Sequence, residues 1–216
     1  MKYFRIPENK IDVIYLGLDV DALTKNINKS GYRKIESREF IIGHIGRLTY
    51  QKAQITLLKA LKLILKKYPD VMLVIIGDGE DKEQLKSYID AEDISRNVTF
   101  KGYIKDVFNE MMNFDVHVLT SRFEGMGYVN LEAMELGVPV ITSNVGGASN
   151  FLTDGYDALI TEVDNENSTA HAIERLKSDP EFRKNIAANA RRTVKDYSIE
   201  RMVRETSQFY LKNLVN

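Results

Sequence analysis

The stretch FIIGHIG, residues 40–46, opens the part of the chain in which short apolar runs alternate with longer amphipathic ones. A short apolar run that ends in a glycine is typical of a strand buried on both faces of a parallel sheet. Five similar runs follow, and the six expected strands are Phe40–Gly46, Val71–Gly77, Asn97–Lys101, Asp115–Thr120, Val138–Thr142 and Ala158–Thr161. The alternation predicts an α/β fold with a doubly wound parallel sheet.

Helical patterns fill the segments between these strands. Apolar residues at positions 55, 58, 61 and 65 form one stripe on a helix that ends near Pro69. Asp179 before Pro180 predicts a helix N-cap, and Ser198 predicts the cap of a last helix that runs to about Leu211. Further helices are expected at Glu80–Glu92, Ile104–Asn113, Gly127–Leu136 and Asn165–Lys177. The chain is therefore expected to end in consecutive helices.

The first 39 residues lack this alternation. Lys10–Tyr15 is one strand-like run, Gly17–Asp21 reads as a turn, and Asn26–Ser37 is polar without a clear period. We therefore expect a lead-in segment at residues 1–39 and one α/β domain at residues 40–216.

The composition is that of a soluble globular protein, with 44% hydrophobic and 28% charged residues among 216. The formal net charge of -1 provides no overall field for holding nucleic acid. The absence of cysteine excludes disulfides, thiolate metal sites and a catalytic thiol. The apolar runs are far shorter than the roughly 20 residues that cross a bilayer, and the first residues contain no apolar targeting region. We expect a cytoplasmic protein.

The loops that follow the strands are where a ligand is expected, because open parallel sheets bind ligands at the carboxyl ends of their strands. After the first strand, Gly46 is followed by two cations, Arg47 and Lys52, that can reach one anion. Two loop cations are more often solvated surface charges. Their position at a strand end favours an anion-binding role.

A glycine-flanked entry into a helix follows the fourth strand. Gly125 and Gly127 let a phosphate approach the free N–H groups and positive dipole of the helix N-terminus. Glu132 lies about one turn inside that helix, where its carboxylate can accept hydrogen bonds from a ribose diol. Glu124, before the helix, is expected on the far side of the phosphate. Two glutamates at this spacing are usually surface residues, but these two bracket the helix start.

Other motifs are weaker. Gly146 and Gly147 permit either close approach of a ligand or an ordinary turn. The loop at Tyr103 can offer backbone groups and an aromatic edge to a base, although an ordinary turn is the commoner case for such a loop. The three histidines, His44, His117 and His171, are scattered, and two lie inside apolar strands, where packed or hydrogen-bonded histidines are commoner than metal ligands. No HExxH, GxxxxGK[ST] or GxSxG pattern occurs.

Taken together, these motifs resemble the C-terminal, donor-binding domain of retaining GT-B glycosyltransferases, the family called glycosyl transferases group 1. The resemblance extends from about Lys10 to Leu211. It rests on GRL…K at 46–52, EGxGxxxxE at 124–132, EAM…GVPV at 132–140 and the glycine pair at 146–147, all in the family's order. It implies a Rossmann-like domain, the C-terminal half of a GT-B architecture, with extra C-terminal helices.

The resemblance also implies roles for single residues. In relatives, the residues that match Arg47 and Lys52 hold the donor diphosphate, and the one that matches Glu132 holds the ribose. The residue that matches Glu124 touches the transferred sugar, which makes Glu124, Arg47 and Lys52 the candidate catalytic residues. The remaining candidate binding positions are Gly46, Tyr103, Gly125, Met126, Gly127, Tyr128 and Val129. No metal or other cofactor is implied.

Three positions depart from the family pattern. Ala53 replaces the glycine that commonly follows the lysine, and Met126 replaces the usual phenylalanine between the glycines. Asn150 stands where an acidic residue often follows the glycine pair, so we do not count it as a site residue.

The expected function is donor binding for transfer of a hexosyl unit from a nucleotide diphosphate sugar to a glycan or lipid-linked acceptor. The N-terminal GT-B domain, which brings acceptor contacts, does not fit into 216 residues. We therefore expect sugar transfer by the isolated chain to be absent or very slow. Any peripheral membrane association is expected to come through the missing N-terminal domain. Two alternatives remain open: a nucleotide-sugar-binding regulatory or scaffold module, and a nucleotide-sugar epimerase.

Overall fold

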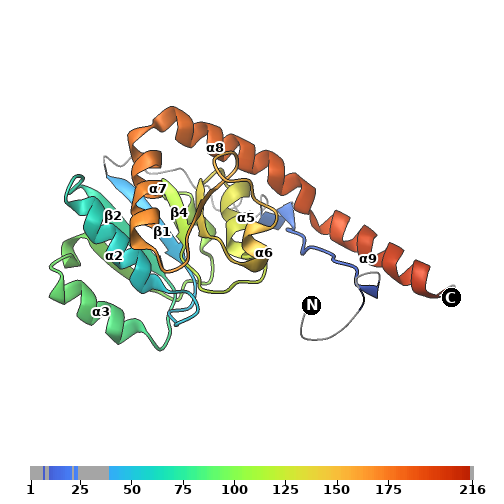
Figure 1. The fold of residues 1–216 in the computed structure, drawn as a ribbon, viewed down its shortest axis with the longest axis horizontal. Helices are drawn as coiled ribbons and strands as arrows, with labels where there is room; N and C mark the ends of the chain where they lie inside the picture. The colour runs from blue at the N-terminus through green and yellow to red at the C-terminus, as the bar shows by residue number, and fades with distance from the viewer. Residues whose placement is uncertain (1–6, 8–9, 21, 24–38, 215–216) are drawn as a thin grey trace.

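A computed structural model describes residues 7, 10–20, 22–23 and 39–214 (Figure 1). Its centre is one sheet of six parallel strands in the order β3-β2-β1-β4-β5-β6. The strands are β1 (Phe40–Ile45), β2 (Val71–Ile76), β3 (Val98–Gly102), β4 (Val116–Leu119), β5 (Val140–Ser143) and β6 (Leu159–Thr161). The predicted doubly wound, Rossmann-like sheet is confirmed, and its strand order reverses between β1 and β4.

The pairing on the two sides of β1 is unequal. β1 pairs with β2 along its whole length, from Phe40 opposite Val71 to Ile45 opposite Ile76. Its ladder with β4 begins only at Ile42 opposite Val116. At the reversal of strand order, the chain leaves β1 toward α2 on one face of the sheet and leaves β4 toward α5 on the other. A crevice at that place is the usual ligand site of such sheets.

The sequence also predicted most of the helices and their caps. Asp179 accepts a hydrogen bond from the N–H of Phe182 at 2.9 Å, and Ser198 accepts one from the N–H of Arg201 at 3.3 Å, which confirms both predicted N-caps. The α-helices are α2 (Gln54–Leu65), α3 (Lys82–Ala91), α4 (Phe108–Met111), α5 (Tyr128–Glu135), α6 (Gly146–Ser149), α7 (Glu166–Ser178), α8 (Pro180–Thr193) and α9 (Ile199–Leu214). Short 3-10 helices lie at η2 (Ser95–Asn97) and η3 (Val194–Tyr197).

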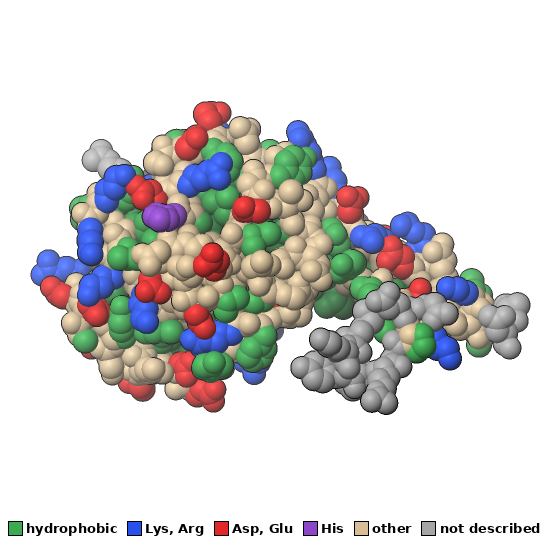
Figure 2. Space-filling model, in the orientation of Figure 1, with side chains coloured by type: hydrophobic (Ala, Val, Ile, Leu, Met, Phe, Trp, Pro, Cys, Tyr) green, Lys and Arg blue, Asp and Glu red, His purple; other side chains and the backbone are tan. Residues whose placement is uncertain are grey.

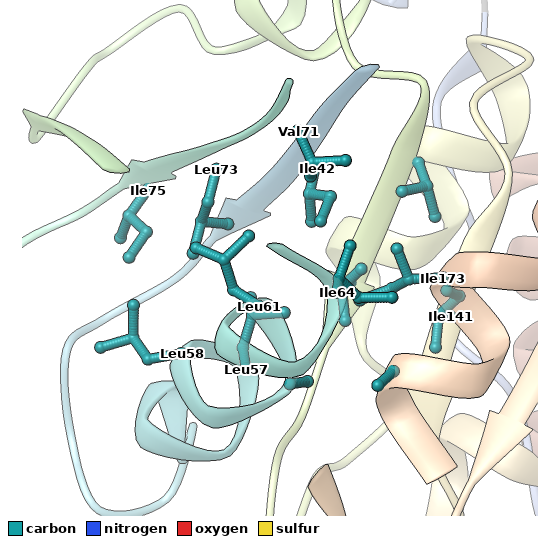
Figure 3. Close-up of a cluster of buried hydrophobic side chains, with 14 of the residues drawn as sticks. Ile42, Leu57, Leu58, Leu61, Ile64, Val71, Leu73, Ile75, Ile141 and Ile173 are labelled. Carbon is teal, nitrogen blue, oxygen red and sulfur yellow. The ribbon is translucent and has the colours of Figure 1, made fainter. Parts of the chain in front are cut away.

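Helices cover both faces of the sheet. On one face α2, α3 and α7 bury their apolar stripes against the strands, and Figure 3 shows Leu57, Leu61 and Ile64 of α2 beside strand residues such as Ile42 and Leu73. On the other face α5 contributes Leu131 and Met134 to a second buried cluster. Burial of this kind contributes about 25 cal/mol for each Å² of apolar surface removed from water. The two layers therefore fix the strand ends on which the candidate site is built.

Two predicted elements are wrong. The helix expected at Ile104–Asn113 is reduced to α4, which begins at Phe108, and Asp106 just before it accepts a hydrogen bond from the N–H of Phe108 at 3.3 Å. The segment Lys10–Tyr15 contains no strand residue, and among the described residues before β1 only Leu18 forms a bridge, with Ser198. The polar stretch Asn26–Ser37 lies outside the described residues.

The described part of the lead-in packs against the C-terminal elements. The ring of Tyr15 meets that of Tyr197 edge-on at 5.6 Å, and the N–H of Leu18 donates to the carbonyl of Tyr197 at 2.8 Å. Beyond this contact α9 projects away from the body of the domain (Figure 1). No residue of α9 is buried, and its apolar side chains at Val203 and Leu214 are exposed.

The face of the molecule drawn in Figure 2 carries charges of both signs. Figure 2 shows basic and acidic side chains interspersed over the face that it draws, in keeping with the formal net charge of -1. Among the helices that the structure describes, none combines the length and apolar character needed to span a bilayer.

Candidate donor-binding site

The turn between β1 and α2 carries the two predicted cations. Its first half is pinned to the end of β2: the N–H of Gly46 donates to the carbonyl of Ile76, and the N–H of Leu48 donates to the carbonyl of Asp78, both at 3.0 Å. The Leu48 side chain is fully buried. Arg47 lies between these anchors with its side chain exposed, so the guanidinium group is free to meet a ligand.

The second half of the turn is joined to the loop that follows β4. The N–H of Arg122 donates to the carbonyl of Gln51 at 2.8 Å, and the side-chain amide of Gln51 donates to the carbonyl of Phe123 at 3.0 Å. The hydroxyl of Thr120 donates to the carbonyl of Ala53 at 3.1 Å. These bonds cross the reversal point of the sheet and hold the two loops against each other.

Lys52 and Glu124 form an ion pair at this junction. Their side chains are only 15% and 13% exposed, so the pair is largely withdrawn from water. The hydroxyl of Ser121 donates a further hydrogen bond to the same carboxylate oxygen at 3.2 Å. The sequence placed these two residues in one site, and the structure brings them into direct contact.

The N-terminus of α5 follows the loop. Gly127 adopts a left-handed conformation with φ of 65° immediately before the helix begins, which a residue with a side chain enters only with strain. Among the described residues, the backbone N–H groups of residues 123 to 129 donate no hydrogen bond outside helix α5. These donors and the helix dipole make the loop suited to an anion.

The side chains of this segment face the protein. Met126 packs into the buried cluster beneath α5, and Val129 packs against it. The hydroxyl of Tyr128 donates to the carbonyl of Gly17 at 2.8 Å, so this side chain anchors the lead-in segment. The predicted contribution of these three residues is therefore limited to backbone groups, except for the part of the Tyr128 ring that stays exposed.

Gly125 and Gly147 lie in neighbouring loops, but a side chain at the two positions would meet different surroundings. A Cβ atom on Gly147 would lie 2.1 Å from the carbonyl oxygen of Gly125, so Gly147 makes room for the chain itself rather than for a ligand. A Cβ atom on Gly125 would meet nothing within 4 Å. Gly125 therefore faces open space, where a ligand can approach the backbone.

Glu132 lies on the second turn of α5 and is half-buried. Desolvation by burial raises the pKa of its carboxyl group from 4.5 to about 7. No ion pair joins Glu132 to another residue of the described chain. The carboxyl group is therefore available to hydroxyl groups of a ligand.

A cavity of about 380 Å³ opens at the carboxyl ends of β1, β2 and β3. Ile45, Ile76, Ile104 and Val107 give it an apolar wall, and Gly46, Arg47, Gly77, Asp78, Tyr103 and Lys105 complete its lining. Tyr103 is 81% exposed. The cavity brings three of the predicted residues together, Gly46, Arg47 and Tyr103, while Lys52 and Glu124 lie outside its lining.

The histidines of the strands are buried. The Nδ1 atom of His44 lies 2.9 Å from the carbonyl oxygen of Val118, and its ring stacks on that of His117 at 6.5 Å. Burial lowers the pKa of His44 to about 4 and that of His117 to about 3, so both rings are neutral at physiological pH. Within the described ranges, no group of three or more His, Asp or Glu residues could hold a metal ion.

Sequence reasoning missed the residues that hold the site together. Arg122 was given no role in the sequence analysis, yet its guanidinium donates to Asp164 at 2.9 Å and to the carbonyl of Tyr50 at 2.7 Å, and it stacks on the Tyr50 ring. Gln54 was assigned no role, yet it is 1% exposed. Gln54 lies four residues before Leu58 of the predicted apolar stripe, and this helical spacing was the available signal for its burial.

Comparison with known proteins agrees with this geometry. The model of the family described as glycosyl transferases group 1 matches residues 26–193. An uncharacterised glycosyltransferase of Methanocaldococcus jannaschii is 32% identical over 96% of this chain and 55% of its own length. The capsular polysaccharide biosynthesis glycosyltransferase CapM of Staphylococcus aureus is 32% identical over 88% of the chain and 52% of its own length.

A galactosyltransferase of Escherichia coli, which acts from UDP-Gal on α-D-GlcNAc-diphosphoundecaprenol, is 29% identical over the whole chain and 58% of its own length. The chain thus spans about half the length of the curated relatives it matches.

Solved structures match in the same way. The crystal structure of Anabaena HepE in complex with UDP-glucose is 25% identical with a TM-score of 0.80, over 93% of this chain and 57% of the other. The C-terminal domain of a glycosyl transferase group 1 family protein (LpcC) from Francisella tularensis is 25% identical with a TM-score of 0.73, over 85% of this chain and all of the other. The fold is therefore that of the C-terminal half of a GT-B architecture.

Proposed function

This chain belongs to the glycosyl transferases group 1 family, and from that premise we propose that it binds the nucleotide diphosphate sugar in a retaining hexosyltransferase. The acceptor in this proposal is a glycan or a lipid-linked sugar. The functions of two relatives support it, since one acts in capsular polysaccharide biosynthesis and another transfers galactose from UDP-Gal to a lipid diphosphate-linked sugar.

The observation that carries the proposal is the contact between Lys52 and Glu124. The two residues are 72 positions apart and come from the loops on either side of the reversal point between β1 and β4. A paired cation and carboxylate beside unpaired backbone N–H groups offer complementary contacts to a diphosphate and to the hydroxyl groups of a sugar. A purely structural ion pair would not need the open space in front of Gly125.

In this proposal, each part of the donor is assigned to one group of these residues. The diphosphate lies between the guanidinium of Arg47, the ammonium of Lys52 and the backbone from Gly125 to Val129. The base enters the apolar cavity beside Tyr103, the ribose diol is held by Glu132, and the sugar contacts Glu124. In this arrangement the candidate groups span one donor molecule from end to end.

Transfer breaks the bond between the anomeric carbon and the oxygen of the diphosphate, and the electron pair leaves with that oxygen. The hydroxyl oxygen of the acceptor forms the new bond to the anomeric carbon, and its proton passes to the departing diphosphate. Negative charge then grows on the departing nucleotide diphosphate. Arg47, Lys52 and the N-terminus of α5 stabilise this charge more in the transition state than in the bound donor. We therefore expect catalysis without a bound metal ion.

The half of the relatives' length that this chain does not span supplies the acceptor contacts in the proposal. The exposed apolar side chains of α9, such as Val203 and Leu214, suit a helix that packs on another domain. The isolated chain should bind the donor weakly and transfer sugar slowly or not at all. Peripheral membrane contact would belong to the absent half, and a cytoplasmic location remains a prediction.

Calorimetry with UDP-, GDP- and ADP-sugars tests the proposal. One of the three should bind, and Arg47→Ala should weaken that binding at least tenfold, since a charged hydrogen bond contributes roughly 1.5–3 kcal/mol. Arg96→Ala is the matched control, because Arg96 is an exposed arginine just before the amino end of β3. Unchanged affinity in Arg47→Ala would favour a scaffold, and altered sugar recovered without any acceptor would identify an epimerase.

A further inference from the structure

A chain of buried hydrogen bonds lies beneath the turn that carries Arg47. It begins at the carbonyl oxygen of Val118, which lies 2.9 Å from Nδ1 of His44. A carbonyl oxygen only accepts, so Nδ1 must carry the hydrogen. The ring is neutral, because burial lowers the pKa of His44 to about 4, and Nε2 therefore presents a lone pair.

Gln54 continues this chain. Its side-chain Nε2 lies 3.0 Å from Nε2 of His44 and 2.7 Å from the carbonyl oxygen of Arg47. The two amide hydrogens of Gln54 thus have two acceptors, one in the ring and one in the turn. With the amide reversed, its oxygen would face two other lone pairs, so the direction of the whole chain is fixed.

The two residues stand at the two ends of the turn. His44 is the fifth residue of β1 and is 0% exposed, and Gln54 is the first residue of α2 and is 1% exposed. A Cβ atom on Gly46 would lie 3.4 Å from Nε2 of His44, so the ring lies directly under the turn. The same Cβ atom would lie 3.6 Å from Cε of Lys52. The buried pair therefore contacts the part of the chain that presents both cations.

We propose that His44 and Gln54 are positioning residues that fix the Arg47 backbone, and with it the orientation of the guanidinium toward the donor diphosphate. The inference rests on the proposed function and adds two residues to it. Neither touches the donor. Both act through the carbonyl of Arg47, whose neighbours Gly46 and Leu48 are held by β2 on the other side of the turn.

A purely structural role of Gln54 and a positioning role predict different effects of its substitution. If Gln54 only satisfied buried polar groups, its loss would lower the melting temperature and leave the affinity of the folded protein for a ligand unchanged. If it positions Arg47, its loss weakens the binding of a diphosphate and leaves the binding of the nucleoside alone unchanged. The two readouts separate the interpretations.

The test uses the full chain in calorimetry with UDP and with uridine, or with GDP and guanosine or ADP and adenosine if one of those nucleotides is the one that binds. Gln54→Leu, which keeps the volume of the side chain, should weaken UDP binding about tenfold and leave uridine binding within about twofold. His44→Phe should do the same. His44→Gln should restore UDP binding to within about threefold, since its amide oxygen can accept from Gln54. Gln84→Leu, on the exposed face of α3, is the control that should change nothing.

Nitrogen-15 NMR of the native protein provides a readout that does not depend on any variant. His44 should be found in the Nδ1–H tautomer, and saturation with UDP should shift the side-chain amide signals of Gln54. The Nε2–H tautomer, unmoved Gln54 signals, or native UDP affinity in Gln54→Leu would each overturn the inference. If native protein binds none of UDP, GDP and ADP, the proposed function fails instead, and the tautomer still reports on the hydrogen-bond chain.

Discussion

Lys52 and Glu124 neutralise each other across the point where the strand order reverses. In a site built for a diphosphate, this pair has a consequence for affinity. The ammonium group of Lys52 already pairs with the Glu124 carboxylate, so its attraction for the negative charge of the donor is partly cancelled. Removing the carboxylate's charge should leave more of the ammonium's field for the ligand.

We therefore expect Glu124→Gln to bind plain nucleoside diphosphate several-fold more tightly than the native protein, while preference for the sugar-bearing donor over the plain diphosphate falls. Calorimetry with UDP and UDP-glucose measures both effects. Asp70→Asn breaks the Lys177–Asp70 ion pair at the other end of the strands and should leave both affinities unchanged. Weaker UDP binding in Glu124→Gln would show that the carboxylate assists the diphosphate rather than competing with it.

Glu132 should make stability depend on pH. Its pKa is about 7 in the folded protein against an ordinary value of 4.5, so between these values the folded state holds a proton that the unfolded chain has lost. The stability contributed by this proton is complete below pH 4.5 and is lost as the pH rises through 7. Above pH 7, Glu132→Gln should be more stable than the native protein by on the order of 2 kcal/mol.

Urea unfolding at pH 4.5 and pH 8.5 measures this difference. The two proteins should be close in stability at the lower pH and diverge at the higher one. Equal unfolding free energies at pH 8.5 would mean that the carboxyl group ionises without cost in the folded state. A ligand without the ribose diol provides a second comparison, since only the diol-bearing nucleotide should lose affinity in Glu132→Gln.

Ala53 stands in a left-handed conformation, with φ of 48° and ψ of 43°, at the start of α2. An alanine in this conformation is strained by roughly 1–2 kcal/mol, whereas glycine, the residue of the family pattern described above, adopts it without strain. Ala53→Gly should therefore stabilise the chain by about 0.5–1 kcal/mol, after the extra chain entropy of glycine is subtracted.

Chemical unfolding measures the change. Ala188→Gly, at an exposed position inside α8, is the matched control and should destabilise by about 1 kcal/mol, since a glycine there lowers helix propensity without relieving strain. Loss of stability in Ala53→Gly would show that the methyl group, which is 2% exposed, packs better than its backbone conformation suggests.

The sequence predicted the sheet because its strands are short apolar runs, a pattern that depends only on burial of both faces. Val71–Ile76 and Val140–Ser143 were recognisable in this way. Elements whose structure depends on contacts with distant parts of the chain could not be recognised from the sequence. The run at Lys10–Tyr15 alternates like a strand, but a strand forms only where another strand offers its backbone, and Tyr15 instead packs its ring on Tyr197.

The same distinction between local patterns and distant contacts applies to the residues of the candidate site. Arg47, Lys52 and Glu124 were found because their motifs are local and lie at strand ends. The contact between Lys52 and Glu124 joins two loops 72 residues apart, and no local pattern states which charges will meet. Gln54 illustrates the same limit, since its partner His44 is ten residues away and only the curvature of the turn brings the two side chains together.

We expect the Arg122 side chain to fix the loop after β4 against the turn between β1 and α2. Its guanidinium links Asp164 to the carbonyl of Tyr50 and stacks on the Tyr50 ring at 4.0 Å. In Arg122→Ala, the amide hydrogens of Lys52 and Ala53, both bonded to the carbonyl of Thr49, should exchange about tenfold faster.

Hydrogen exchange followed by NMR gives this rate residue by residue. Arg175→Ala removes a comparable stacking contact, with Phe182 at 3.8 Å, between α7 and α8, and should leave the turn's exchange unchanged. Native exchange rates in Arg122→Ala would mean that the backbone bonds between Arg122 and Gln51 hold the loops without the side chain.

Gly125 and Gly147 provide a paired test of which glycine faces the ligand. A methyl group on Gly147 would come within 2.1 Å of the Gly125 carbonyl oxygen, so Gly147→Ala must displace one loop and should destabilise the fold by roughly 1–3 kcal/mol.

A methyl group on Gly125 meets no protein atom within 4 Å. Gly125→Ala should therefore keep native stability, yet lose at least tenfold in nucleoside diphosphate affinity because the methyl group occupies the space of the phosphate. Thermal unfolding and calorimetry on the two variants separate the effects, and native affinity in a stable Gly125→Ala would place the diphosphate elsewhere.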